Sequence, residues 1–496
     1  MQPLTVIINF PGGIISPGNL YNILVAATRA KIQYVRFGLR QQLYLDTISY
    51  NAATFTGELS RLAIDYEIDQ SQYPNIVSSY PGEEIFIRNS WLTEGVYQDV
   101  LAAIDFKPSL KVNICDHSQS FTPMLTGNIN WIASAAAEHY WHLIIRFPKT
   151  NVVYEWDQLC YTNSISRLTR QIEALITSQP ADFIDNIQAS GAELFSLMQT
   201  DDYILKKATQ PVSTVPFNLP YYEGLNRYNN KYWLGIYRRD ELFKVAFLKK
   251  LCLLCTDTKV GQICCTSWKS IVIKGIAEQD KIRWNNLLEE FNINMRHAAN
   301  ELNFQVEDNC MEGLQLKNYL VKYLSIDDIR TFGICVGIKT RKKSEIFSSI
   351  LIRKRYLVHF MGIKLFPVYD ILRAKDFNPN ERTEEIFSSG NLKAMLPEQL
   401  RRVIMKFYTF RKETSQYKKA VSPTAKVNTP LLQEENLYQC SRCFTIYNEA
   451  IGEMESNIPP HTAFQQLGES YCCPVCEGTK DEFIKISHSA LAYTPS

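Results

Sequence analysis

The sequence predicts an α+β protein with a large body, built from two copies of one unit, and a small metal-binding domain at the C-terminus. Two observations support this prediction. A β-α-β pattern near the N-terminus recurs about 230 residues further along the chain, which indicates an internal duplication. Two Cys-x-x-Cys pairs, Cys440 with Cys443 and Cys473 with Cys476, then lie close to the C-terminus.

The composition is that of an ordinary globular protein. A chain of 496 residues is too long for one hydrophobic core, and its hydrophobic content of 46% is typical of a folded protein. The net charge of +2 argues against a dedicated nucleic-acid-binding protein, and no apolar run reaches the roughly 18 residues of a membrane helix. Thirteen cysteines without a secretory signal pattern favour metal ligands and reduced thiols. We therefore expect a cytoplasmic protein that binds neither nucleic acid nor membranes.

The first copy of the repeated unit occupies the N-terminal residues. Residues 4–10 are β-rich and predict a strand. Ser16 followed by Pro17 predicts a helix start, with serine as the N-cap and proline in the first turn. The run 34–45 predicts the strand that returns after this helix.

The second copy has the same order of elements. Residues 231–236 predict the strand, 240–254 the helix and 263–273 the returning strand. In this alignment Arg40-Gln41 corresponds to Trp268-Lys269. Each copy is followed by a longer segment with strand and helix patterns, so we expect the two copies to be related by a pseudo-two-fold axis.

We divide the chain into a body of four parts, a linker and a C-terminal domain. The linker segment is polar, contains proline and shows no apolar periodicity. The predicted parts are half-domains at 1–85 and 211–285, α/β domains at 86–210 and 286–410, the linker at 411–436 and the C-terminal domain at 437–485.

The four cysteines of the C-terminal domain predict a metal site with four thiolate ligands. The two pairs can bind one ion together, because each pair supplies two thiolates from its loop. In the sequence, 29 residues separate the pairs. Tetrahedral sulfur coordination suits both iron and zinc. The aromatic residues between and around the pairs supply the core that so small a domain needs beside its metal. We interpret Cys472, next to Cys473, as a spare thiol.

This domain resembles the rubredoxin family. The residues that match the order and spacing of that family, besides the cysteines, are Tyr438, Tyr447, Gly452, Phe464, Leu467 and the run Lys480-Asp-Glu-Phe483. The resemblance implies one Fe (2+/3+) bound by four Cys, which transfers a single electron. Rubredoxins usually place glycine directly after each pair, where this chain has Phe444 and Glu477, and this departure bears on the reduction potential. A structural zinc ribbon is the alternative.

The body resembles the nitrite and sulfite reductase family, whose core is a duplicated ferredoxin-like half-domain that alternates with larger α/β domains. Gly38-Leu-Arg40-Gln41 stands where that family has a Thr-Arg-Gln-like element, and Thr266-Ser-Trp268-Lys269 where it has a Thr-Pro-Trp-Gln-like element. Ile87-Arg88-Asn89 resembles the Arg-Asn that follows the first half-domain. By this resemblance Arg40, Arg88 and Lys269 are candidate ligands for an anion or for a sirohaem-like cofactor.

One departure from that family affects the expected cofactors. The family binds a [4Fe–4S] cluster, coupled to sirohaem, through a Cys-x5-Cys and a Cys-x3-Cys pair, and neither pair occurs in the body, residues 1–410. The remaining cysteines of the body predict ordinary packing, with an unusual cluster formed by Cys252, Cys255, Cys264 and Cys265 as the alternative. We expect a body that has kept the scaffold and lost the [4Fe–4S] cluster.

These features predict an electron-transfer protein rather than a self-sufficient reductase. Its mononuclear iron would serve a redox partner protein, such as a nitrite or sulfite reductase system, in assimilatory metabolism. Two alternatives remain. One is a cluster-less sirohaem-type reductase that is fed by its own rubredoxin domain, and the other is a structural zinc-ribbon protein.

Overall fold

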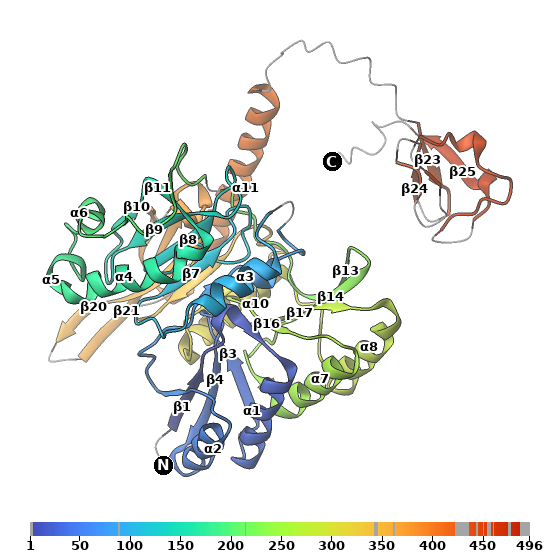
Figure 1. The fold of residues 1–496 in the computed structure, drawn as a ribbon. Coiled ribbons are helices and arrows are strands. Elements are labelled where there is room, and N and C mark those ends of the chain that lie inside the picture. Colours follow the sequence, from blue (N-terminus) through green and yellow to red (C-terminus); the bar gives the residue numbers. More distant parts are fainter. Residues whose placement is uncertain are drawn as a thin grey trace. The chain divides into compact units, whose positions relative to one another are not determined.

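The computed structural model divides the chain into two units, Met1–Glu413 and Thr414–Ser496 (Figure 1). It describes residues 3–87, 90–213, 215–341, 346–360, 363–381, 383–421, 436–442, 445–449, 451–453, 458–459, 461–474 and 478–486. Within these ranges, no helix combines the length and the apolar character that crossing a bilayer requires.

Two antiparallel sheets of five strands contain the repeated unit. The first has the strand order β15-β3-β4-β1-β5 and the second β13-β14-β17-β16-β2. The elements of the first copy are β1 (Pro3–Ile8), β2 (Ile14–Ile15), α1 (Pro17–Arg29), β3 (Tyr34–Phe37), β4 (Leu43–Ile48), α2 (Ser49–Arg61) and β5 (Glu67–Ile68). Those of the second are β13 (Gly224–Tyr228), β14 (Lys231–Ile236), β15 (Phe243–Lys244), α7 (Val245–Asp257), β16 (Ile263–Cys265), β17 (Ile271–Ile276) and α8 (Lys281–Glu290). Helix α1 begins as predicted, because Ser16 Oγ accepts a hydrogen bond from the Asn19 N–H (3.2 Å).

The two sheets exchange a strand. Strand β2 precedes α1 in the sequence but pairs with β16 of the second sheet, and β15 precedes α7 but pairs with β3 of the first. Helices α1 and α7 pack against each other (Figure 1), and apolar side chains of both copies, such as Leu24 and Leu251, belong to one buried cluster. The two predicted half-domains therefore share a single core.

Each predicted returning strand is a hairpin in the structure. A turn at 38–42 joins β3 to β4, and a turn at 266–270 joins β16 to β17. The fourth residue of each turn has a positive φ, 62° at Gln41 and 56° at Lys269. The same backbone hydrogen bonds close both turns, from Gly38 N–H to Gln42 O (2.9 Å) and from Thr266 N–H to Ser270 O (3.0 Å). The alignment of Gln41 with Lys269 is confirmed, whereas the prediction of one continuous strand was wrong in both copies.

The two larger sheets of the body also repeat one connectivity. In the first sheet β6, β7 and β8 are parallel and β9 and β11 follow antiparallel, and in the second β18, β19 and β20 are parallel and β21 and β22 follow antiparallel. The elements of the first are β6 (Val77–Ser78), α3 (Glu94–Ala103), β7 (Val112–Cys115), β8 (Ile129–Ala133), β9 (Tyr140–Arg146), β10 (Val153–Glu155), β11 (Gln158–Tyr161), α4 (Ile165–Ser178), α5 (Pro180–Phe183), α6 (Gly191–Ser196) and β12 (Leu205–Lys207). Those of the second are α9 (Ala299–Leu302), β18 (Phe304–Val306), α10 (Met311–Ile326), β19 (Val336–Lys339), β20 (Ile350–Phe360), β21 (Ile363–Ala374), β22 (Glu384–Asn391) and α11 (Leu396–Val421).

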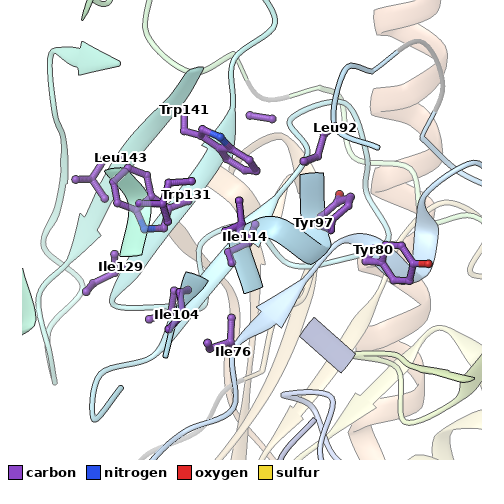
Figure 2. Packing of buried hydrophobic residues seen from close by; sticks show 14 of the residues in the cluster. Ile76, Tyr80, Leu92, Tyr97, Ile104, Ile114, Ile129, Trp131, Trp141 and Leu143 are labelled. Carbon is purple, nitrogen blue, oxygen red and sulfur yellow. The ribbon is translucent and has the colours of Figure 1, made fainter. Parts of the chain in front are cut away.

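Tryptophans fill the core beside the first larger sheet. Trp131 of β8 and Trp141 of β9 are fully buried in the cluster that also contains Tyr97 of α3 (Figure 2). The Trp131 Nε1–H donates to Thr169 Oγ1 (2.9 Å) and the Trp141 Nε1–H to Thr162 Oγ1 (3.0 Å). Both indoles are therefore buried without an unsatisfied donor.

Helix α11 extends into the segment predicted as a linker. The helix begins at Leu396, within the predicted second α/β domain, and continues to Val421, so residues 411–421 of the predicted linker are helical. This stretch contains glutamine, glutamate, lysine and arginine, which favour helices, and the first proline follows only at Pro423. The rest of the predicted linker, 422–435, lies outside the described residues.

The C-terminal unit contains a small antiparallel sheet with the order β24-β23-β25. Its strands are β23 (Leu437–Cys440), β24 (Ile446–Asn448) and β25 (Phe483–Ile486). Strand β23 lies in the centre and leads directly into the first cysteine pair.

Candidate metal centre

The two cysteine pairs begin in turns of the same construction. The Cys440 N–H donates to the carbonyl of Thr445 (2.9 Å), and the Cys473 N–H donates to the carbonyl of Gly478 (2.8 Å). In both cases the acceptor lies five residues after the first cysteine. Cys440 and Cys473 are 0% and 1% exposed. Two equivalent loops thus each bury a thiol.

Glu482 connects the two loops. Its carbonyl accepts the N–H of Ser441 (2.8 Å), and its Oε1 accepts from Arg442 Nε (2.7 Å), so it binds the first loop twice. Its Oε2 accepts the N–H of Thr479 (2.9 Å), which directly follows the second loop. Thr479 and Glu482 form a capping box at the start of a short 3-10 helix.

An aromatic cluster supports the loops. Phe464 stacks on Tyr438 with a centroid distance of 4.2 Å and also contacts Tyr471 and Phe483. Its backbone N–H donates to Glu449 Oε1 (2.8 Å), and Tyr447 donates its hydroxyl hydrogen to the carbonyl of Thr462 (2.8 Å). The aromatic filling that the sequence predicts is therefore the core of this unit.

Of the four predicted ligands, the structure describes Cys440 and Cys473, while Cys443 and Cys476 lie outside the described residues. Within the described part of the chain, no three His, Cys, Asp or Glu side chains are arranged to hold a metal ion. The buried sulfurs at the start of two equivalent loops fit one half of a four-thiolate site, whose donor type suits iron or zinc. Cys472 is exposed and its thiol donates to the carbonyl of Ser470 (3.6 Å).

The candidate cofactor ligands of the body occupy different surroundings. Arg40 is buried and donates to the carbonyls of Asn75 (2.7 Å) and Val112 (3.0 Å). It also lines a cavity of about 280 Å³ together with Lys111 and Arg341. Lys269 is not among the residues that line this cavity, and Arg88 lies outside the described residues.

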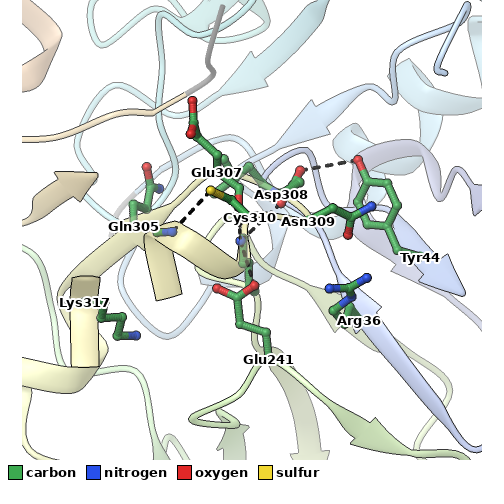
Figure 3. A network of polar contacts seen from close by, with 12 residues as sticks. Arg36, Tyr44, Glu241, Gln305, Glu307, Asp308, Asn309, Cys310 and Lys317 are labelled. Atoms are coloured by element: carbon green, nitrogen blue, oxygen red, sulfur yellow. Dashed lines mark hydrogen bonds and ion pairs between the residues drawn. The ribbon is translucent and has the colours of Figure 1, made fainter. Parts of the chain in front are cut away.

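Lys269 belongs to a buried ionic network. Its Nζ lies 2.8 Å from Glu241 Oε2 and 3.4 Å from Asp308 Oδ1, and its side chain is 4% exposed. Asp308 also accepts the Leu39 N–H (3.2 Å) and the Tyr44 hydroxyl hydrogen (3.3 Å; Figure 3). Because Leu39 lies in the first hairpin turn and Lys269 in the second, Asp308 links the two turns that the duplication made equivalent.

The cysteines of the body are buried in apolar surroundings. Cys252, Cys255 and Cys265 belong to the core shared by α1 and α7, whereas Cys264 belongs to the cluster beside the first larger sheet. Burial raises the pKa of the Cys252 thiol to about 12. A thiol must lose its proton to bind a metal, so this environment favours the protonated, packed state.

The connecting roles of Asp308 and Glu482 do not follow from the predicted site residues. The partners of Asp308 are Leu39, Tyr44 and Lys269, and no sequence pattern brings such distant residues together. The contact between Glu482 and Thr479 could have been predicted, because Thr479-x-x-Glu482 is the spacing of a capping box.

Comparison with known proteins places the C-terminal residues among the rubredoxins. Residues 437–483 match the family model described as Rubredoxin. Rubredoxin-2 of Chlorobaculum tepidum is 45% identical over 49 residues, which cover 10% of this chain and 94% of that protein. Rubredoxin 4 of Rhodococcus sp. is 34% identical over 55 residues, which cover 11% of this chain and 92% of that protein. This match supports an iron centre with cysteine ligands and a role in electron transfer.

The body has the fold of a solved structure, that of the Mycobacterium tuberculosis NirA protein. The two superpose with a TM-score of 0.62 and 14% sequence identity, over 82% of this chain and 81% of that chain. The predicted fold class, an α+β body with an internal duplication followed by a rubredoxin-like domain, is confirmed, and the fold of the body is that of NirA.

Proposed function

This chain belongs to the rubredoxin family through residues 437–483, and from this premise we propose that it is an electron carrier with one iron bound by Cys440, Cys443, Cys473 and Cys476. The observation that carries the proposal is the pair of equivalent loops. In each loop the first cysteine is buried, and its N–H donates to the carbonyl five residues further along. A structural zinc ribbon would use the same donors, so the metal itself is the point to test.

The residues of the domain suit a site that changes charge without changing shape. When bound, the iron supplies a one-electron couple between its 2+ and 3+ states. Glu482 connects the two ligand loops, and the aromatic cluster around Phe464 includes Tyr438 and Tyr471, each two residues before the first cysteine of a pair. Loops anchored in this way would keep the sulfur atoms of Cys440 and Cys473 in place, which limits the rearrangement that accompanies electron transfer.

For the body we propose a role with a redox partner protein in assimilatory nitrite or sulfite metabolism, in the cytoplasm. The fold similarity to NirA supports this setting. Eight described cysteines of the body are buried and form no disulfide, which agrees with a reducing compartment.

A second candidate is a cluster-less sirohaem-type reductase that receives electrons from its own rubredoxin domain. The observation that favours it is the cavity of about 280 Å³, because Arg40, Lys111 and Arg341 give its lining three cationic side chains. Such a lining suits an anion. Glu307 and Asp308 line the same cavity, however, and balance part of this charge.

The visible spectrum and metal content of the full chain, purified from iron-replete cells, test these functions. We expect one iron per chain and a red oxidised form that dithionite bleaches. Stoichiometric zinc in a colourless protein would overturn the proposal in favour of the zinc ribbon. Sirohaem absorption together with sulfite or nitrite turnover would establish the second candidate.

A further inference from the structure

A groove of about 760 Å³ lies between helices α1 and α7. The two helices pack side by side (Figure 1). The groove is lined by Tyr21 and Thr28 of α1, by residues 31–34, which follow that helix, and by residues between 244 and 253 at the start of α7. It shares no lining residue with the cavity beside Arg40, so it is a separate feature of the body.

Apolar side chains form much of the lining of this groove. Ile32 and Val245 are buried, whereas Tyr34 is 42% exposed and Leu253 49%. Sites for small organic ligands are concave, lined mainly by apolar side chains, and have volumes of roughly 300–1,000 Å³. The groove therefore has the size and the apolar walls of a small-molecule site.

The charged side chains of the lining are all lysines, namely Lys31, Lys244, Lys249 and Lys250. Lys250 forms an ion pair with Glu290 of α8, and Lys249 Nζ lies 3.5 Å from the neutral Thr28 Oγ1. Within the part of the chain that the structure describes, no carboxylate forms an ion pair with the other three lysines. Lys244 is also the N-cap residue of α7, where the helix dipole disfavours a cation. The groove thus has a positive charge that an anion would offset.

The duplication indicates that the fold does not require these lysines. Helices α1 and α7 both have 13 residues, so their first residues can be aligned. The buried positions that the two helices then share are Pro17, Leu20, Ile23, Leu24 and Ala27 in α1 and Val245, Leu248, Leu251, Cys252 and Cys255 in α7. In the same alignment Lys244 and Lys249 correspond to the uncharged Ser16 and Tyr21. The positive charge is therefore specific to the second copy, and packing of the repeated unit does not account for it.

From these observations we propose that the groove binds a small amphipathic anion, that is, a molecule with an apolar body and one anionic head such as a carboxylate. The apolar body lies against Ile32, Val245 and Leu253, and the head group lies beside Lys244 and Lys249. The volume of the groove favours a small molecule over a protein or a membrane, because those partners contact a protein over a larger and flatter area. Neither iron nor the C-terminal domain is involved, so this inference is independent of the proposed function.

Isothermal titration calorimetry of the full chain with decanoate, at concentrations below micelle formation, tests the proposal. We expect one decanoate per chain with a Kd below about 1 mM. Decylamine has the same apolar chain and the opposite charge, so it should bind at least about tenfold more weakly. Equal affinity for the two ligands would overturn the proposal, because the lysines would then play no part in binding.

Two variants locate the site in the groove. The double variant Lys244→Ala/Lys249→Ala should raise the Kd for decanoate at least about tenfold. Lys206→Ala/Lys207→Ala removes the same charge from two exposed lysines of β12, and this matched control should leave the Kd unchanged. Leu253→Glu places a carboxylate in the groove at a position that is 49% exposed, and it should weaken decanoate binding without removing a lysine.

Three results would overturn the proposal. The first is a wild-type chain without saturable decanoate binding, or with binding that survives both groove variants. The second is flotation with phosphatidylglycerol vesicles in place of decanoate binding, lost in the double lysine variant, which would favour an anionic membrane surface. The third is lysine-dependent binding of a polyglutamate peptide in place of decanoate, which would favour an acidic protein partner.

Discussion

The carboxylate of Glu482 lies 2.6 Å from the guanidinium of Arg442, although 40 positions separate the two residues. Arg442 belongs to the loop of the first cysteine pair, and Glu482 also accepts the N–H of Thr479 after the second pair. One side chain thus joins the two loops that carry the predicted ligands, across the sequence that separates them.

Replacing Glu482 by alanine should loosen the iron site. The variant loses the contacts to Arg442 and Thr479, which together correspond to about 1–2 kcal/mol of unfolding free energy. We expect faster loss of the visible absorption in guanidinium with a chelator. Asp481→Ala is the control, since Asp481 lies in the same turn and is exposed. If the two variants lose their visible absorption at equal rates, the contacts of Glu482 with the two loops do not stabilise the iron site.

The cysteine substitutions should separate a ligand from its neighbour. Cys440→Ser should abolish the colour and unfold the C-terminal domain, because metal binding and folding are coupled in small sites. Cys472→Ser should keep the colour and the folded C-terminal domain, since Cys472 is exposed. Visible absorption and iron content measure the outcome. Loss of iron in the Cys472 variant alone would reverse the assignment.

Asp370 should make the body sensitive to acid. Burial acts to raise the pKa of this carboxyl, but hydrogen bonds from the Gly390 N–H, Ser389, Arg355 and Arg353 outweigh it and lower the pKa to about 2. The folded pKa lies below the usual value of 3.8, so the stabilisation is complete above pH 4 and is lost as the pH falls through 2. The charged Asp370 carboxylate thereby contributes about 2 kcal/mol to the free energy of unfolding.

Thermal unfolding of the wild type and of Asp370→Asn between pH 2 and 7 checks this expectation. The variant should be less stable than the wild type at pH 7, and the difference should shrink toward pH 2. A constant difference across this range would contradict the assigned role of the Asp370 charge.

Glu241→Gln should destabilise the body strongly. The variant leaves the Lys269 ammonium buried with one of its two carboxylates removed, and breaking a buried ion pair costs about 3–5 kcal/mol. Glu301→Gln is the control, because its partner Arg239 is 57% exposed and such a pair contributes about 1 kcal/mol or less. The melting temperatures of the two variants give the comparison, and equal values would show that Lys269 does not need Glu241.

The sequence predicts those features that depend on local spacing. The Cys-x-x-Cys pairs, the Ser16 cap and the aromatic core around Phe464 could all be read from neighbouring residues. The hairpin turns could not, because the left-handed conformations at Gln41 and Lys269 are held by distant partners rather than favoured by the residues themselves. The Gln41 amide binds the N–H and C=O of Ser78 (2.9 and 2.8 Å), and Lys269 binds Glu241. The exchange of β2 and β15 depends in the same way on pairing between residues far apart in the chain.

That exchange has a consequence for the order in which the body can fold. The first sheet lacks its edge strand until Phe243–Lys244 has been synthesised, and β16 must be made before Ile14–Ile15 has a neighbour. Contacts over such sequence separations are slow to form, because a long loop must close before any of them is made. The N-terminal copy should therefore remain incompletely folded after its synthesis until the second copy has also been made. A chain severed between residues 210 and 211 should yield fragments that fold only when both are present.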